Sequence, residues 1–206
     1  MLPSITFLLA ATVLAITPGP GIAYVVARTV SGGKAEGFAS SLGTAVGGLV
    51  HVMAAALGLS LLIVESALAY SVLKYLGAAY LVYLGLKTLL SKASSSKLPT
   101  VERSGSRKAL MDGILVETLN VKTAMFFLAF IPQFVSTERP VAPQFVLFGN
   151  ICVALNTGAD LLAVVAASRF VASGTARHAR ERLLSRVSGV TMLALGAFVA
   201  VAKRAA

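Results

Sequence analysis

Charged and amide side chains lie within two segments of the chain that are otherwise apolar. They are Glu117, Asn120 and Lys122 in residues 113–134, and Asn156 and Asp160 in residues 150–170. A charge placed at the centre of a bilayer costs at least about 2.5 to 3.5 kcal/mol on insertion scales. Such residues therefore usually face the interior of a helix bundle, have a partner, and mark the path of a substrate or ion.

A third segment offers chemistry through its backbone. The sequence TPGPG follows the apolar run FLLAATVLAI, and it supplies the candidate substrate-binding residues Thr17, Pro18, Gly19, Pro20 and Gly21. The prolines remove two backbone donors, and the glycines loosen the chain between them. Non-helical backbone is tolerated at membrane depth only against protein or a water-filled cavity. The segment therefore predicts a binding cavity, with a simple proline kink as the alternative.

The three segments are predicted to meet at one depth. Pro18, Val121 and Asp160 each lie about nine residues from the same end of their segments, which is roughly 13 Å along a helix. We expect Lys122 and Asp160 to form an ion pair across the bundle. The alternative is that Lys122 and Glu117 extend to the membrane surface.

These charges suggest how a zwitterion would bind. The loosened backbone at 17–21 offers amides and a half-helix terminus to a carboxylate, assisted by Lys122. Asp160, with Glu117, would take an ammonium group. A buried acid without a partner can also accept a proton, so Asp160 and Glu117 are the candidates for coupling transport to proton entry.

The elements that must position these residues are membrane-spanning helices. The chain is 57% hydrophobic and 13% charged, with a mean hydropathy of +0.85, whereas ordinary globular domains carry about 25% charge. Segments of about 20 apolar residues predict six helical spans. These are roughly 4–27, 38–64, 68–90, 112–134, 143–168 and 187–203. On span 2, Gly43 and Gly47 are spaced for close helix packing.

The basic residues predict the orientation of the spans. The net charge is +10, and most lysines and arginines lie in the connection 28–37, the linker 91–111 and the stretch 169–186. The positive-inside rule places these three in the cytoplasm and both termini outside. The linker separates two halves of three spans, about 1–90 and 112–206. The fold expected is thus an all-α integral membrane protein of two inverted three-helix repeats, forming one domain over 1–206.

The remaining reactive residues argue against an enzyme or a metal site. Cys152 is the single cysteine, and the two histidines, His51 and His178, are isolated. We expect no cofactor and no metal. An inorganic cation exporter, which would need several converging ligands, and a non-transporting membrane scaffold remain the alternatives.

The order and spacing of these motifs resemble a known family. TPGP late in span 1, LGTAVGGLV in span 2, LGAAYLVYLGLKTL in span 3 and LNVKTAMFFLAFIPQF in span 4 are similar to the LysE/RhtB-type translocators. The resemblance covers nearly the whole chain and implies amino-acid export from bacteria. The family usually has an acid or amide where this chain has Gly21, and a proline where it has Val121. Replacing that proline restores a helical hydrogen bond, so we expect span 4 to be straight.

The function predicted from these features is export of amino acids or related small zwitterions across the bacterial inner membrane. The expected energy source is the proton gradient. The expected partners are the amino-acid substrate and the bilayer. Anionic lipid would face the basic run ARHARERLLSR at 176–186. A homo-oligomer is left open, and nucleic acid is not expected.

Overall fold

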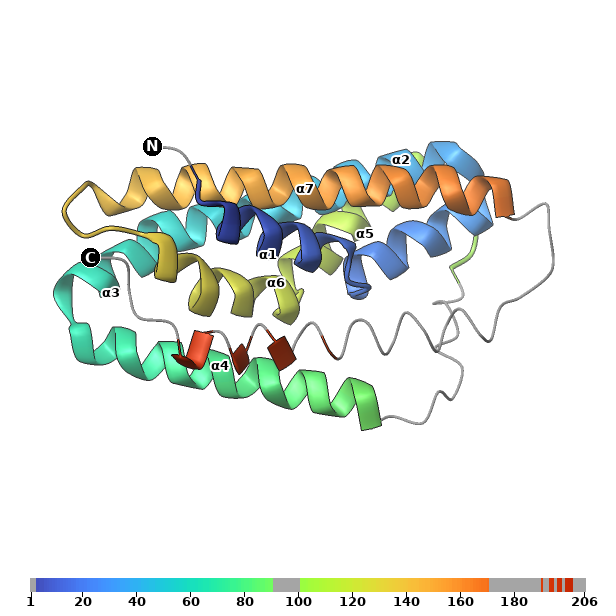
Figure 1. Cartoon of the computed structure of the whole chain (residues 1–206). Coiled ribbons are helices and arrows are strands. Elements are labelled where there is room, and N and C mark those ends of the chain that lie inside the picture. Colours follow the sequence, from blue (N-terminus) through green and yellow to red (C-terminus); the bar gives the residue numbers. More distant parts are fainter. Residues whose placement is uncertain are drawn as a thin grey trace.

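The computed structural model of the protein describes residues 3–90 and 101–170, together with residues 190, 193–194, 196–197 and 199–201. The described residues are helices and their connections (Figure 1). Residues 91–100 of the basic linker, the run 176–186 and much of the expected sixth span lie outside them. Three described helices are long and apolar enough to cross a membrane, or four if one bent pair counts as a single span.

The predicted break after the first apolar run is confirmed. Helix α1 (Ile5–Ile16) ends directly before Thr17, and α2 (Pro20–Ala54) begins at Pro20. Thr17 is extended and its hydroxyl donates to the carbonyl of Val13 at 2.6 Å, which closes the last turn of α1. Pro20 occupies the first turn of α2, where a missing N–H costs nothing.

Helix α2 contains a reversal of direction rather than the loop expected at 28–37. Gly33 has φ 78° and ψ −172°, a left-handed φ that favours glycine. On either side of Gly33 the helix forms two arms that run in opposite directions (Figure 1). The first arm is residues 20–32 and the second is residues 34–54. The chain therefore does reverse within the predicted connection, at Gly33. The connection is tighter than expected, because the residues on either side belong to the helical arms, and Arg28 is buried in the first one.

The second arm continues into a single π-helical turn, η1 (Ala55–Leu59), and then α3 (Ser60–Glu65). Helix α4 (Ala67–Leu90) follows and agrees closely with the expected third span. Helix α7 (Val141–Phe170) agrees with the expected fifth span.

The expectation of a straight fourth span is wrong. Helix α5 (Ser106–Thr118) and the following helical segment, Val121–Phe134, are bent by 41°. That segment consists of α6 (Val121–Met125), the π turn η2 (Phe126–Phe130) and the 3-10 turn η3 (Ile131–Phe134). Asn120 causes the break in place of a proline, because its side chain accepts a hydrogen bond from the backbone N–H of Lys122 at 3.1 Å and caps α6.

Helix α2 packs chiefly against α5 and α7, and the contact with α5 brings backbones together. A Cβ added at Gly43 would lie 2.2 Å from the carbonyl oxygen of Leu110, and one at Gly47 would lie 2.6 Å from that of Ile114. Only glycine permits this approach, as small residues do in membrane helix pairs generally.

This contact gives a prediction for stability. Gly43→Ala should destabilise the protein by about 1 to 3 kcal/mol, because the new methyl group must push two backbones apart. Gly58→Ala is the matched control, since a Cβ there meets no atom within 4 Å. Thermal unfolding in detergent would compare the two variants. Equal unfolding temperatures would show that the α2–α5 contact tolerates the added volume.

Candidate functional site

A cavity lies where the two helix breaks face each other. Its lining comes from α1, both sides of the first break, the second arm of α2, the α5–α6 break and α7. Of the residues singled out in the sequence, it includes Thr17, Gly19, Gly21, Glu117, Asn120, Lys122, Asn156 and Asp160. Pro18 and Pro20 are not in the lining, although they define the break.

The side chain of Lys122, on α6, reaches the break between α1 and α2, and Lys122 is 8% exposed. Its ammonium donates hydrogen bonds to the carbonyl oxygens of Thr17 at 2.8 Å and Leu14 at 3.2 Å. In a continuous helix these two carbonyls would accept from the N–H groups of residues 21 and 18. The break withholds those partners, and the ammonium of Lys122 takes their place at the carbonyl end of α1, where the helix dipole favours a cation.

The expected ion pair between Lys122 and Asp160 is not formed. Within the described part of the chain, neither Lys122 nor Asp160 forms an ion pair. Asp160 instead accepts a hydrogen bond from the hydroxyl of Thr44 at 2.7 Å. The two residues do line the same cavity. Each side chain is bonded to a different neighbour, Lys122 to backbone carbonyls and Asp160 to Thr44.

Glu117 is buried at the end of α5 and is held by two neighbours across the second break. One carboxylate oxygen accepts from the hydroxyl of Thr123 at 2.6 Å, and the other accepts from the amide of Asn120 at 2.9 Å. The alternative in which Glu117 and Lys122 extend to the membrane surface is therefore wrong. Both side chains are turned inward and are almost fully enclosed.

The glycines of the first break leave room for these charged groups. A Cβ added at Gly21 would lie 2.6 Å from Oε2 of Glu117, and one added at Gly19 would lie 3.0 Å from Nζ of Lys122. The Glu117 carboxylate thus occupies the space that a side chain at position 21 would need. An acidic side chain therefore lies beside residues 17–21, although none of these five residues is acidic.

Two residues that complete the site, Thr44 and Thr123, carried no signal in the sequence, and His51, an isolated histidine there, lies just outside the lining. Thr44 and Thr123 hold the two carboxylates, as hydroxyl donors that resemble any other helical threonine. His51 packs beside Phe127, and its Nε2 lies 2.9 Å from the carbonyl oxygen of Glu117 at the end of α5, where it secures the broken helix. No group of three or more potential metal ligands occurs among the described residues.

The charges in the cavity do not balance if all are ionised. Lys122 supplies one positive charge, whereas Glu117 and Asp160 supply two negative charges. The cavity leaves a volume of about 30 Å³ for the centres of water molecules, which is room for only a few of them. The site can therefore attract a cationic group or a proton, and a molecule much larger than water would enter only after the lining side chains move.

The sequence matches the LysE type translocator family over residues 12–203. The chain belongs to this family. It is 28% identical to a homoserine/homoserine lactone efflux protein of Salmonella typhimurium, with 97% of this chain and 96% of that protein aligned. It is 29% identical to a membrane protein of Vibrio cholerae over 74% of each chain. A membrane protein of Bacillus subtilis, YrhP, is 30% identical over 70% of this chain and 73% of its own.

No solved structure matches the chain significantly. Together, the family, these relatives and the long apolar helices establish a multi-pass membrane protein.

Proposed function

We propose that this protein exports amino acids or closely related small zwitterions through the cavity between the two breaks. The observation that carries the proposal is the placement of a buried ammonium and two buried carboxylates around one stretch of broken helix. A zwitterion presents the complementary pair of charges. Homoserine and its lactone are the first candidates, because two relatives are named as their efflux proteins.

The carboxylate of the substrate would bind at the start of α2. The first-turn N–H groups of a helix have no partner within the helix, and here they belong to Gly21 and Ile22, which line the cavity. The ammonium of Lys122 lies beside Gly19 at the same turn. Positive charge from the side chain and from the helix terminus would therefore act together on an anionic group.

The ammonium group of the substrate would bind between the acids, with Asp160 as its main partner and Glu117 beside it. Asn156 and Asn120 supply further polar surface. Because the cavity holds one more carboxylate than ammonium, we propose that one acid carries a proton in the absence of substrate. Release of that proton into the cytoplasm would couple export to proton entry, with Asp160 or Glu117 as the carrier.

The two breaks also support the proposed architecture of inverted repeats. The first half opens with a helix broken between Ile16 and Pro20, and the second half opens with one broken between Thr118 and Val121. Broken helices at matching positions in two halves are typical of transporters whose halves have opposite orientation. We propose six spans in one domain, located in the bacterial inner membrane with the basic linker in the cytoplasm and both termini outside.

An efflux assay tests the function directly. Cells expressing the protein would be loaded with dipeptides that release single amino acids inside, and the amino acids that appear outside would be measured. We expect faster efflux of one or a few amino acids than in cells that express Glu117→Gln. Equal efflux across the whole panel would favour the scaffold alternative. The Glu117→Gln protein must reach the membrane in normal amounts, because cells that lack the protein would also show low efflux.

A further inference from the structure

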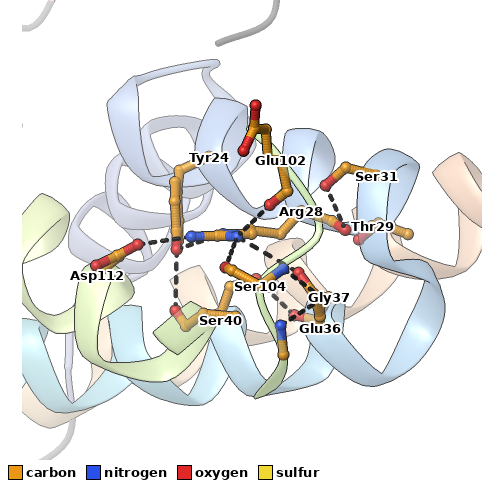
Figure 2. Close-up of polar contacts among 12 residues, drawn as sticks. Tyr24, Arg28, Thr29, Ser31, Glu36, Gly37, Ser40, Glu102, Ser104 and Asp112 are labelled. Carbon is orange, nitrogen blue, oxygen red and sulfur yellow. Dashed lines mark hydrogen bonds and ion pairs between the residues drawn. The ribbon is translucent and has the colours of Figure 1, made fainter. Parts of the chain in front are cut away.

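Arg28 is the centre of a second polar cluster, outside the cavity (Figure 2). Its side chain is 2% exposed although it carries a permanent charge. The guanidinium donates to the hydroxyl of Tyr24 at 2.7 Å and to the Asp112 carboxylate at 2.6 Å. It also lies 3.4 Å from the carboxylate of Glu36 on the second arm of α2.

The same cluster binds residues 102–105, a short non-helical segment before α5 that we call the strap. Arg28 donates to the carbonyl of Glu102 at 3.0 Å and to the hydroxyl of Ser104 at 2.6 Å. Glu36 accepts from the backbone N–H groups of Ser104 at 3.2 Å and Gly105 at 2.8 Å. The two side chains that bind the strap, Arg28 and Glu36, thus come from the two arms of α2.

The cluster is built on the same three helical segments as the cavity. On the first arm of α2, Arg28 lies seven residues after Gly21, which is about 10 Å along the helix. On α5, Asp112 lies five residues before Glu117, or about 7.5 Å. On the second arm, Glu36 precedes Thr44. The cluster therefore joins these segments on the strap side of the cavity.

The opposite side of the cavity is packed differently. There, buried apolar side chains form a continuous core that includes Phe7, Phe126, Phe130 and Phe148. Such a core is held together by close van der Waals packing. A cluster of charges and hydrogen bonds can instead open and exchange its partners for water, and Asp112, with 38% of its side chain exposed, already lies at the edge. A buried ion pair often adds little to the free energy of unfolding. The cluster around Arg28 can therefore have a role other than stability.

We propose that Arg28, Glu36 and Asp112 form a latch that closes the cavity on the strap side, and that the latch opens to admit substrate. The proposal rests on the proposed function, because the cavity it closes is the proposed transport site. A cavity with room for only a few water molecules is what a closed state of the latch requires. Opening would let the two arms of α2 and α5 separate beside the strap, while the aromatic side stays closed.

Access to the cavity tests the latch without any transport measurement. In a Cys152→Ser background, Ala45→Cys would place a thiol in the cavity lining, and a membrane-impermeant maleimide would be applied to each face of the membrane separately. A second protein with Arg103→Cys, at an exposed position in the strap, identifies the strap face. The labelling rate would be compared with and without Asp112→Asn.

We expect Asp112→Asn to raise labelling from the strap face at least about tenfold and to leave labelling from the other face unchanged. Ser104→Ala, which removes one bond to Arg28 and no charge, should give a smaller rise and guards against a variant that fails to fold. Unchanged labelling in both variants, or an equal rise from both faces, would overturn the latch. Failure of the amino-acid efflux assay would leave this result standing, so the two proposals are tested separately.

Discussion

Replacing Lys122 with methionine is expected to reduce export of an amino acid much more than export of its methyl ester or lactone. Methionine keeps most of the length of the side chain and loses only the ammonium. A hydrogen bond to a charged group contributes about 1.5 to 3 kcal/mol, which corresponds to a tenfold or greater loss of affinity. The ester and the lactone have no free carboxylate, so they lose much less.

The measurement is substrate flux into or out of liposomes containing the purified protein, with homoserine and homoserine lactone as the first pair. Lys108→Met is the matched control, because Lys108 is exposed in the first turn of α5 and should have no effect on either compound. Lys122→Met also leaves the Thr17 carbonyl without its donor, at a cost of about 1 to 3 kcal/mol. Flux is therefore normalised to folded protein. An equal loss for both compounds would remove Lys122 from carboxylate binding.

The parts of the site that the sequence predicted are those with strong local signals. Two prolines and two glycines at 17–21 interrupt any helix, and the structure breaks there. Acids and a lysine in apolar segments must turn inward, and Glu117, Lys122 and Asp160 are buried around one cavity. In each case one large local cost, of proline inside a helix or of a charge in an apolar environment, leaves the chain few alternatives.

The partners of those residues could not be predicted, for a physical reason. Position along a span gives depth, but depth leaves open which neighbours a side chain contacts around the helix. Lys122 donates hydrogen bonds to backbone carbonyls. Because every residue has a carbonyl, no residue type in the sequence identifies these partners. Val121 in place of a proline predicts a straight helix. The helix breaks nevertheless, because the side chain of Asn120 caps α6.

Arg28 shows the same limit. The positive-inside rule counts an arginine as a cytoplasmic surface charge, whatever its surroundings. Here the turn at Gly33 brings Glu36 back to Arg28, and the strap brings Ser104 from far along the chain. Only the three-dimensional arrangement shows that this charge is enclosed.

Replacing both Pro18 and Pro20 with alanine is expected to abolish export while the protein still inserts and folds. Alanine restores two N–H donors and favours the helix by about 3 kcal/mol per position over proline. In the continuous helix that results, the carbonyls of Leu14 and Thr17 accept from residues 18 and 21. Those are the two carbonyls that hold Lys122, so the ammonium loses its place at the break. The amide of Gly21 is consumed in the same step.

Two measurements distinguish this outcome from a simple change of helix direction. Amide hydrogen exchange at Gly19, Gly21 and Ile22, which have an N–H in both proteins, should slow in the double variant because the newly formed helix protects those groups. Efflux should fall by more than tenfold. Pro143→Ala is the matched control, since Pro143 is exposed in the first turn of α7 and its replacement should change neither quantity. If exchange slows while efflux stays normal, the break only sets the direction of the helix. The backbone at 17–21 would then have no part in binding substrate.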